Sequence, residues 1–316
     1  MRSPDFLSPW RKHLIDHGAL LALVLLVIYN LLFTPSFLSL QTLNVNLTQI
    51  TTIVIVGVGM TLVIATAGID LSVGASMAIA GTLAPLIYLN FPSPLGMAAS
   101  FVVPLLVTAG CGCFNAWLVT AFRIQPIVAT LVLFIAGRGV AQVMTNGNLL
   151  PFDSQGFSML GKGYVLGVPI QVVLMLAIVV IASWSLRRTL FGKYVVAIGS
   201  NERAAWLTGI PSVRIIFWVY AICGTLAGLA GMITVSINAA SDANQNGLGM
   251  ELDAIAAAAV GGTLLTGGRA RIFGTLLGAM IIQLMRYTLL AHGVPDAAAM
   301  VFKAVIILIA VGVQKK

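Results

Sequence analysis

Charged side chains are scarce in this sequence. Lysine, arginine, aspartate and glutamate make up 8% of its 316 residues, whereas 59% are hydrophobic. Soluble domains carry about 25% charged and about 45–50% apolar residues. So few polar groups cannot cover so large an apolar surface in water. The composition therefore excludes an ordinary soluble protein and indicates a chain whose solvent is lipid.

Cysteine and histidine are also rare, with three residues of each. The cysteines, Cys111, Cys113 and Cys223, lie in apolar stretches, and positions two apart on a helix point to nearly opposite sides. His13 and His17 share a helix face, but no cysteine or acidic cluster completes a tetrahedral metal site beside them. We therefore expect no disulfide framework, no metal site and no cofactor.

Side-chain groups that would indicate catalysis are missing too. The spacing of a phosphate-binding loop occurs over residues 156–163, but Gly163 stands where a serine or threonine must reach the magnesium ion. No nucleophile with an accompanying base is recognisable. The formal charge of +8 lies in short gaps between apolar runs, which argues against nucleic-acid binding. We expect a protein that is not an enzyme and does not hydrolyse ATP itself.

Long apolar runs fill most of the chain. In a bilayer the backbone must satisfy its own hydrogen bonds, so each run is expected to form a helix, and a crossing needs about 20 residues. We predict an all-α, polytopic membrane protein of about ten transmembrane helices. The predicted crossings are Gly18–Phe33, Ile50–Ala67, Leu71–Leu89, Leu95–Ala121, Ile124–Thr145, Gly167–Leu186, Val213–Ser236, Leu252–Thr266, Ile272–Leu290 and Ala297–Val313.

The distribution of basic residues predicts the orientation. An even number of crossings places both termini on one side, and with that side cytoplasmic, all but four of the seventeen basic residues face the cytoplasm. We therefore expect both termini in the cytoplasm. The chain is expected to form a single transmembrane domain over residues 1–316, in which residues 1–17 are a cytoplasmic N-terminal segment.

A long basic connection, Arg187–Ser212, follows the sixth predicted crossing. Asn201 can cap a short helix, and Gly209 suits the C-terminal end of that helix. Ala204 and Ala205 give the helix a small surface that a neighbour can approach closely. Because a bare linker needs fewer residues, we interpret this segment as a docking site for a cytoplasmic partner. A solvated positive anchor is the alternative.

The connection between the second and third predicted crossings contains Gly68, Asp70, Ser72 and Gly74. Asp70 or Ser72 can accept hydrogen bonds from the first free amides of the third helix, and a carboxylate there suits the helix dipole. The pattern predicts a tight, capped turn in the membrane. The functional alternative is a hinge near a cytoplasmic gate.

Two arginines, Arg138 and Arg286, lie within predicted crossings, in the outer third of each, and Glu251, Asp253 and Asp296 lie at outer helix ends. We hypothesise that Arg138 or Arg286 pairs with Asp253 in a polar collar at the outer mouth. Snorkelling of the arginines to the headgroups is the alternative. Because the carboxylates fall near helix ends, none is expected at mid-membrane, which argues against an ion-coupled transporter.

Asparagine, serine and aspartate gather at the outer end of the seventh predicted crossing. Asn238 and Asn244 belong to this stretch. Their amide groups can bind the hydroxyl groups of a solute such as a sugar, or they can form a capped outer turn. We assign them to a substrate pathway as a hypothesis.

Three motifs, in order along the chain, resemble one known family. Residues 59–74 (GMTLVIATAGIDLSVG), 197–205 (AIGSNERAA), and 251–256 with 260–263 (ELDAIA and VGGT) are similar to ABC sugar permeases of the ribose, xylose and arabinose type. The similarity extends from about residue 49 to residue 313. Residues 125–130 and 136–142 look most like a permease subunit of a galactofuranose importer.

The resemblance implies a type II-like ABC importer permease of the bacterial inner membrane. It implies two permeases, a periplasmic sugar-binding protein and an ATPase with two nucleotide-binding cassettes, whose ATP hydrolysis drives alternating access. In galactofuranose-type systems the permeases differ, which implies a heterodimer, with a homodimer as the alternative. The coupling segment would be residues 187–212, and its contact residues would be Ala197, Gly199, Asn201, Glu202, Arg203, Ala204, Ala205 and Gly209.

Three other functions compete with this interpretation. The chain could serve an ABC importer for branched amino acids or a furanose-like signal, act as an ion-coupled secondary sugar transporter, or be a membrane scaffold that transports nothing. The scaffold is disfavoured by the long docking segment, and the ion-coupled transporter by the expected absence of mid-membrane carboxylates.

Overall fold

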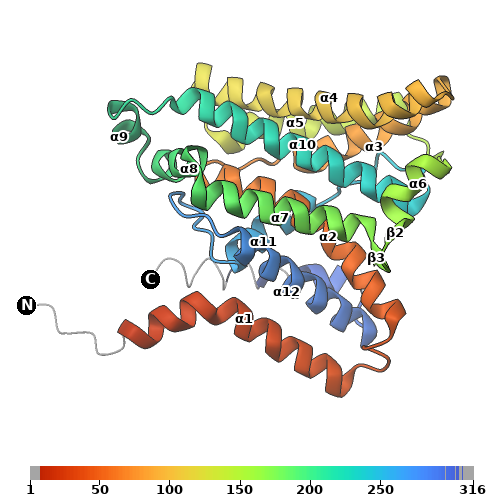
Figure 1. The fold of residues 1–316 in the computed structure, drawn as a ribbon, viewed down its shortest axis with the longest axis horizontal. Coiled ribbons are helices and arrows are strands. Elements are labelled where there is room, and N and C mark those ends of the chain that lie inside the picture. Colours follow the sequence, from red (N-terminus) through yellow and green to blue (C-terminus); the bar gives the residue numbers. More distant parts are fainter. Residues whose placement is uncertain (1–7, 296, 303, 306–307, 309–316) are drawn as a thin grey trace, which may run out of the picture.

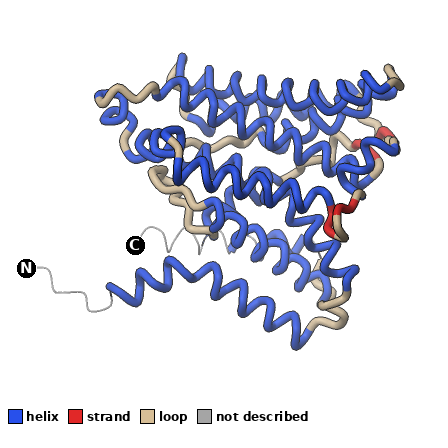
Figure 2. The backbone as a smooth tube through the Cα atoms, viewed as in Figure 1, coloured by secondary structure: helices blue, strands red, loops and turns tan. Residues whose placement is uncertain are grey.

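The computed structural model describes residues 8–295, 297–302, 304–305 and 308, and their side chains from residue 18 onward. Figure 2 shows that long helices form nearly all of the described chain, and that short strands gather at one end of the bundle. In chain order the elements are α1 Ser8–Phe33, α2 Leu40–Ala65, α3 Val73–Asn90, α4 Pro94–Ala121, α5 Pro126–Met144, β1 Leu150–Pro151, α6 Gln155–Lys162, β2 Tyr164–Val165, β3 Val168–Pro169, α7 Ile170–Arg188, α8 Leu190–Ser200, α9 Glu202–Leu207, α10 Ser212–Asn238, β4 Ala240–Ser241, α11 Met250–Val260 and α12 Ile272–Ala291.

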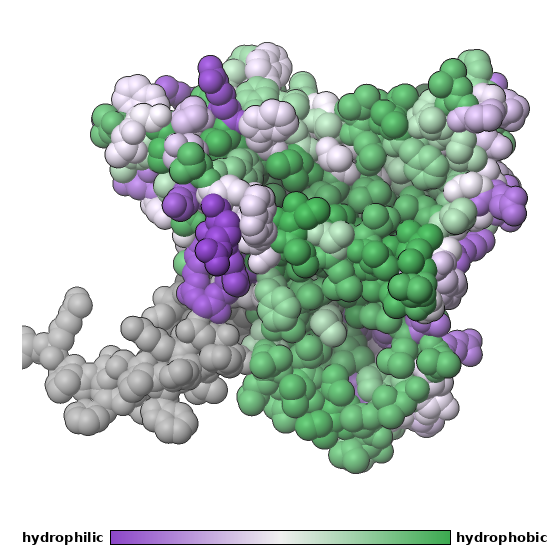
Figure 3. Space-filling view, in the orientation of Figure 1, coloured by the Kyte–Doolittle hydropathy of each residue, from purple (hydrophilic) through white to green (hydrophobic). Residues whose placement is uncertain are grey.

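Seven of the described helices are long and apolar enough to cross a membrane, namely α2, α3, α4, α5, α7, α10 and α12. The apolar part of α1, Gly18–Phe33, is shorter. Apolar side chains cover the middle of the molecule, and polar side chains gather at its two ends (Figure 3). This surface is the one expected of a helical bundle in lipid. The predicted polytopic, mainly helical membrane protein is confirmed.

The core of the bundle is α2. Every residue from Ile50 to Ala65 is buried, and α7, α10, α11 and α12 pack around the helix. A helix that is apolar on all sides belongs in such an interior position. Where α2 meets α10, a Cβ on Gly59 would lie 2.9 Å from the Cα of Cys223, so small residues on both helices allow the close approach.

The outermost described helix, α1, is tied to α12 by polar side chains. Asn30 donates from Nδ2 to Oγ1 of Thr288 over 2.7 Å, and Thr34 donates to Oδ1 of Asn30 over 2.8 Å. Hydrogen bonds of this kind join helices inside membranes, where no hydrophobic effect drives their association. In Figure 1, α1 lies at the edge of the bundle next to α12.

Two helices begin earlier than the sequence predicted. The first is helical from Ser8, so residues 8–17 continue the first helix, and their cytoplasmic location stays a prediction. The second begins at Leu40 rather than Ile50, after Ser39, whose Oγ accepts a hydrogen bond from the Thr42 amide over 3.1 Å. Polar residues in the first turns of α2 lower the local hydropathy and hide this start. The predicted tenth crossing, Ala297–Val313, lies partly outside the described residues, because residues 303, 306–307 and 309–313 are not described.

The helix of the predicted eighth crossing, Leu252–Thr266, is shorter than expected. The structure has the helix α11 over Met250–Val260, whose 11 residues span about 16 Å, roughly half of a hydrocarbon core of about 30 Å. The helix stops where Gly261 packs directly on the backbone of Gly274 at the start of α12. The third helix is also shorter at its start, because α3 begins at Val73.

Candidate functional site

The segment after α2 turns back into the bundle. Asp70 and Ser72 are each 1% exposed, although both lie outside the helices. Asp70 accepts at Oδ1 from the amide of Ser72 over 2.9 Å and from its hydroxyl over 2.6 Å. Asn115 on α4 donates to both residues, at 2.8 Å to Ser72 and at 3.3 Å to Asp70. The predicted turn thus lies in the interior, but the predicted cap is wrong, because no side chain accepts a hydrogen bond from the first amides of α3. Asp70 is held by Ser72 and Asn115 instead.

A second segment, residues 242–249, enters the bundle between β4 and α11. Its Asn246 is 5% exposed and donates from Nδ2 to the carbonyls of Met77 on α3 (3.1 Å) and Gly231 on α10 (3.3 Å). Gly247, at φ +72°, lies so close to Gly74 that a Cβ on Gly74 would overlap the Gly247 carbonyl oxygen. Glycine at both positions permits this backbone contact.

The helix α5 holds this second segment in place. Arg138 donates from Nη1 to the carbonyl oxygens of Ala243 (2.9 Å) and Asn246 (2.6 Å). One turn further, Gln142 donates from Nε2 to Oδ1 of Asn244 over 2.8 Å. A guanidinium bound to backbone carbonyls is one of the few ways to place an arginine inside a membrane protein. Arg138 therefore fixes the course of the segment.

The two segments lead into equivalent sequences. Residues 68–83 read GIDLSVGASMAIAGTL, and residues 249–264 read GMELDAIAAAAVGGTL. Seven of the sixteen positions are identical, and Asp70 corresponds to Glu251. Motifs taken one at a time do not reveal this internal repeat. Comparing the two segments would have shown that Glu251 occupies the position equivalent to Asp70.

The repeated segments run in opposite directions from a common meeting point. α3 ends near the short strands, where the ring of Tyr88 packs edge-on against the ring of Phe152 with 5.9 Å between the centroids. α11 instead ends beside the start of α12, at the end of the bundle that carries α8 and α9 (Figure 1). Both helices begin where Gly74 meets Gly247. Discontinuous helices in an inverted repeat, meeting inside the membrane, are a common way to build a transport site.

A buried carboxyl group lies at this junction on each side. Glu251 is 7% exposed, and its Oε2, 2.7 Å from where a Cβ on Gly74 would lie, has no hydrogen-bond partner. It occupies the first turn of α11, and the charge of Arg138 acts on it. The expectation that Glu251 lies at an outer helix end and that no carboxylate lies inside the membrane is therefore wrong. The helix ends themselves are inside the bundle.

Two cavities approach the junction from opposite ends. One, of about 1290 Å³, is lined by the turn after α2, the end of α4, α9 and the start of α10, and reaches Gly68 and Tyr220. The other, of about 320 Å³, lies beside the paired strands β1 and β4, and its lining includes Asn238 and Asn246. We call these the inner and outer cavities. The junction of α3 and α11 separates them.

The polar collar is not assembled around Arg138 as predicted. Arg138 binds carbonyls of residues 243–246, and the carboxylates whose charge acts on it are Glu251 and Asp242 rather than Asp253. These hydrogen bonds of Arg138 therefore go to the second segment, residues 242–249, rather than to a carboxylate. A pairing of Arg286, on α12, with Asp253 stays a prediction.

The predicted docking segment forms two helices, α8 and α9, at one end of the bundle (Figure 1). Asn201 caps α9 by accepting the amide of Ala204 over 2.9 Å, and Gly209 follows at φ +83°. Trp206 and Leu207 are 68% and 71% exposed. The short capped helix was predicted, whereas α8 was not.

The backbone of α8 touches the end of the core helix. A Cβ on Gly199 would overlap the Ala65 carbonyl oxygen and lie 2.6 Å from the amide of Gly268. The Gly268 amide in turn donates to Ala65 over 3.1 Å. The end of α2, which leads into the Asp70 turn, is therefore in direct contact with the docking segment.

Arg138 gives a testable stability prediction. Replacing it by glutamine leaves two buried carbonyls without a charged donor, so the free energy of unfolding should fall by about 1.5–3 kcal/mol. Thermal unfolding in detergent measures the loss, and hydrogen exchange should show faster exchange over residues 243–249. Arg123→Gln, an exposed arginine at the other end of α5, is the control and should unfold as the native protein does. Equal unfolding of both variants would contradict the role given to Arg138.

The fold and the site define a class, namely a helical membrane permease in which the repeated segments that lead into α3 and α11 meet inside the bundle. The family described as "branched-chain amino acid transport system / permease component" matches residues 43–311, and the chain belongs to this family. It is a multi-pass protein of the inner membrane.

Known relatives match the chain over nearly its whole length. The galactofuranose transporter permease protein YtfT of Escherichia coli K12 is 36% identical over 99% of this chain and 94% of its own. The ribose import permease protein RbsC of the same strain is 39% identical over 98% and 96%. The fructose import permease protein FruF of Bifidobacterium longum is 34% identical over 92% and 85%. No solved structure matches. The resemblance to sugar permeases is thus confirmed.

Proposed function

We propose that the chain is the non-catalytic permease subunit of a bacterial ABC importer for a neutral sugar, a pentose or a hexofuranose such as galactofuranose. Its partners would be a second permease, different or identical, an ATPase on the side of α8 and α9, and a sugar-binding protein on the opposite, periplasmic side. The relatives named for ribose, galactofuranose and fructose support the substrate class.

The observation that carries the proposal is the pair of carboxyl groups at the junction. Free amides at the start of a half-helix carry partial positive charge and bind anionic groups of substrates in several transporters. Here the chain supplies its own carboxyl groups at both starts, Asp70 before α3 and Glu251 in α11. A crossing point with this arrangement offers hydrogen-bond acceptors to an uncharged solute rich in hydroxyl groups and leaves no free helix start for the carboxylate of an amino acid.

Coupling to ATP hydrolysis would pass through α8. A partner that moves α9 also moves α8, whose Gly199 lies against Ala65, and thereby moves the turn that holds Asp70. The same turn lines the inner cavity together with Glu202 and Arg203 of α9. We therefore assign residues 197–209 to coupling, the turn from Gly68 to Gly74 to the gate, and the outer cavity to the pathway of the sugar.

The substrate is tested with the partner proteins. The permease, the ATPase and the binding protein encoded with it are assembled in liposomes, and uptake of ribose, fructose and galactofuranose is compared with that of leucine. We expect ATP-dependent uptake of one sugar. Uptake of leucine alone would establish the branched amino acid importer instead.

The topology, ten crossings with both termini cytoplasmic, gives a second test. A cysteine placed at Ser200, exposed on α8, should react with a membrane-impermeant maleimide only after the cells are opened. A cysteine at Asn244, exposed in the segment that follows β4, is the matched control and should react in intact cells. The reverse pattern would overturn the topology and the coupling assignment.

A further inference from the structure

Some buried polar atoms have no hydrogen-bond partner within the described part of the chain. Four of them are the hydroxyl oxygen of Tyr220, Oδ1 of Asn115, Oε2 of Glu251 and Oδ1 of Asn246. Such an atom loses its hydrogen bonds to water and gains none in return, so native proteins contain few of them and each needs an explanation. We call these four side chains the polar row, because they follow residues 68–81 in order.

The polar row begins at the inner cavity with Tyr220 on α10. This residue is 1% exposed but lines the cavity, and its hydroxyl oxygen lies 2.7 Å from where a Cβ on Gly68 would be. Asn115 on α4 follows, with its Nδ2 bound to Asp70 and Ser72 and its Oδ1 without a partner. Both side chains therefore lie against the turn between α2 and α3, which is assigned to the gate.

The polar row continues along α3 to the outer cavity. The Oε2 of Glu251 lies 2.7 Å from where a Cβ on Gly74 would be. Further along, the Nδ2 of Asn246 donates to the carbonyl of Met77 and would overlap a Cβ on Gly81. Asn246 also lines the outer cavity. The four side chains thus accompany this segment from one cavity to the other.

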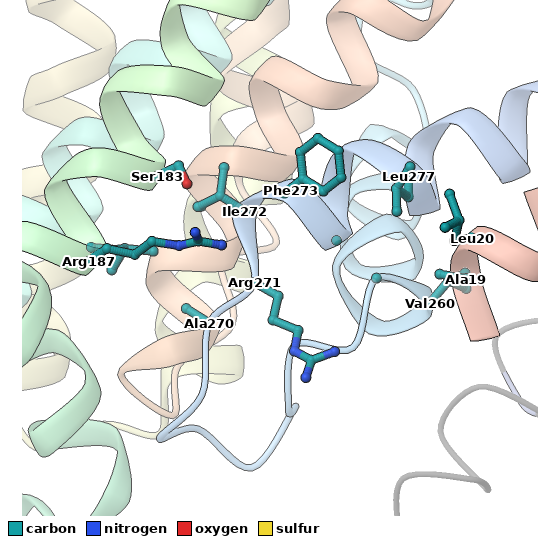
Figure 4. A pocket seen from close by; sticks show the side chains of 13 residues that line it. Ala19, Leu20, Ser183, Arg187, Val260, Ala270, Arg271, Ile272, Phe273 and Leu277 are labelled. Carbon is teal, nitrogen blue, oxygen red and sulfur yellow. The ribbon is translucent and has the colours of Figure 1, made fainter. Parts of the chain in front are cut away.

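A third cavity provides a comparison. It lies between α1, α7, α11 and the start of α12, and its volume of about 320 Å³ equals that of the outer cavity. Figure 4 shows that apolar side chains and two arginines make up most of its lining. Among the described residues, none that lines this cavity has a buried polar atom without a partner. The unpartnered atoms of the polar row therefore distinguish the two cavities at the junction from a cavity elsewhere in the bundle.

The chemistry of the polar row suits a solute rich in hydroxyl groups. A hydroxyl group both donates and accepts hydrogen bonds, so a sugar can donate to the amide and carboxyl oxygens and can also bind the hydroxyl of Tyr220. In this conformation the four atoms are shielded from solvent. A solute therefore reaches them only when the turn and the start of α3 move away from α10 and from residues 242–249.

We propose that the polar row binds the hydroxyl groups of the sugar as it crosses the junction, and that Tyr220 makes the last of these contacts before release into the inner cavity. This inference rests on the proposed function as a sugar permease. When the junction opens, the unpartnered atoms gain hydrogen bonds to the sugar, which offsets part of the free energy needed to separate α3 from α11. The polar row thereby contributes to the choice of solute as well as to its passage.

The first test is Tyr220→Phe, which removes one hydroxyl group and keeps the ring. ATP-dependent uptake by the complete importer in liposomes is measured with ribose, fructose and galactofuranose, using whichever of them the native importer takes up. We expect the maximal rate to fall at least about five-fold, because a hydrogen bond to the moving sugar is lost. The half-saturating sugar concentration should stay the same, since the binding protein sets it. The unfolding midpoint should not fall, because the hydroxyl has no partner to lose.

Discrimination between sugars gives a readout that a purely structural role would not change. The native importer should take up the parent sugar faster than at least one of its monodeoxy analogues, because the missing hydroxyl leaves a buried polar group unpaired. Tyr220→Phe should reduce that preference at least about five-fold. The same binding protein is present in both assemblies, so its own selectivity cancels in the comparison.

A second position tests the polar row independently of Tyr220. Glu251→Gln keeps a hydrogen-bonding side chain and should retain most of the native uptake, whereas Glu251→Leu should lose at least about ten-fold. Tyr88→Phe is the matched control for the tyrosine variant, since Tyr88 lies on α3 near the short strands and lines neither the inner nor the outer cavity. It should transport sugar as the native protein does.

The possible failures can be told apart. Native uptake and native discrimination by Tyr220→Phe, an equal loss in Tyr88→Phe, or a lower unfolding midpoint that accompanies the loss would each overturn the role of the polar row while leaving the sugar permease intact. Equal uptake by Glu251→Gln and Glu251→Leu would do the same. A native importer that takes up no sugar would overturn the proposed function itself, and this inference with it.

Discussion

Replacing Gly74 by alanine is expected to reduce sugar uptake by the assembled importer at least about ten-fold and to lower the free energy of unfolding by about 1–3 kcal/mol. The Cβ would overlap the carbonyl oxygen of Gly247 and approach Oε2 of Glu251 to 2.7 Å. Because the obstacle is backbone, no rotamer change relieves it. The start of α3 must then move away from the start of α11, which separates the two half-helices at the crossing point.

The measurement is ATP-dependent uptake into liposomes, normalised to the amount of folded permease. Gly139→Ala is the matched control, since Gly139 lies on the neighbouring α5 and a Cβ there meets nothing within 4 Å. We expect native uptake from the control. Native uptake from Gly74→Ala as well would show that the junction is not part of the transport pathway.

The double variant Trp206→Ala/Leu207→Ala should weaken binding of the ATPase by about 10- to 100-fold without changing the fold. Both side chains are largely exposed at the tip of α9, and tryptophan is enriched among the residues that dominate the binding energy of protein interfaces. The short helix itself depends on the Asn201 cap and on buried Ala205, which the variant leaves intact. The loss should therefore appear in assembly and in sugar-stimulated ATP hydrolysis.

Trp218→Ala supplies the comparison, because Trp218 is 64% exposed but lies on α10, away from α9. Co-purification of the ATPase with each variant measures assembly, and the unfolding midpoint verifies the fold. Normal assembly of the α9 variant, or an equal defect in Trp218→Ala, would remove α9 from the coupling surface.

Hydropathy alone was enough to predict most of the bundle. The runs that became α2, α4, α7, α10 and α12 are long, apolar and flanked by basic or turn-forming residues, so their helical state follows from the bilayer. The capped helix α9 was also predictable, because Asn201, Gly209 and Pro211 act locally. In each case the information lies within a few residues of sequence.

The short helix α11 could not be found this way. The stretch after Leu252 is alanine- and glycine-rich, and its apolar character does not say whether it crosses the bilayer or stops halfway. The stop is set by tertiary contact, since Gly261 packs on Gly274, which lies beyond the next loop. The depth of Glu251 has the same origin. The sequence clue to the position of Glu251 is the repeat of residues 68–83 at 249–264. Comparing these two segments aligns Glu251 with Asp70.

The position of Arg138 illustrates a second limit. Its place within an apolar helix predicted a polar partner, and the structure supplies backbone carbonyls from a segment more than 100 residues away in sequence rather than the expected carboxylate of Asp253. The sequence shows that Arg138 needs a polar partner. Which groups bind it depends on how α5 packs against residues 242–249.

The central claim is that movement of a neutral sugar through this chain is driven by ATP on a partner, despite the carboxyl groups of Asp70 and Glu251 inside the bundle. Uptake into liposomes tests it directly, with the permease alone or with its ATPase and binding protein, under a proton or sodium gradient or with ATP. We expect sugar uptake only in the complete assembly supplied with ATP, and we expect this uptake to be unchanged when the ion gradients are collapsed. Sugar accumulation by the permease alone, driven by either gradient, would contradict it.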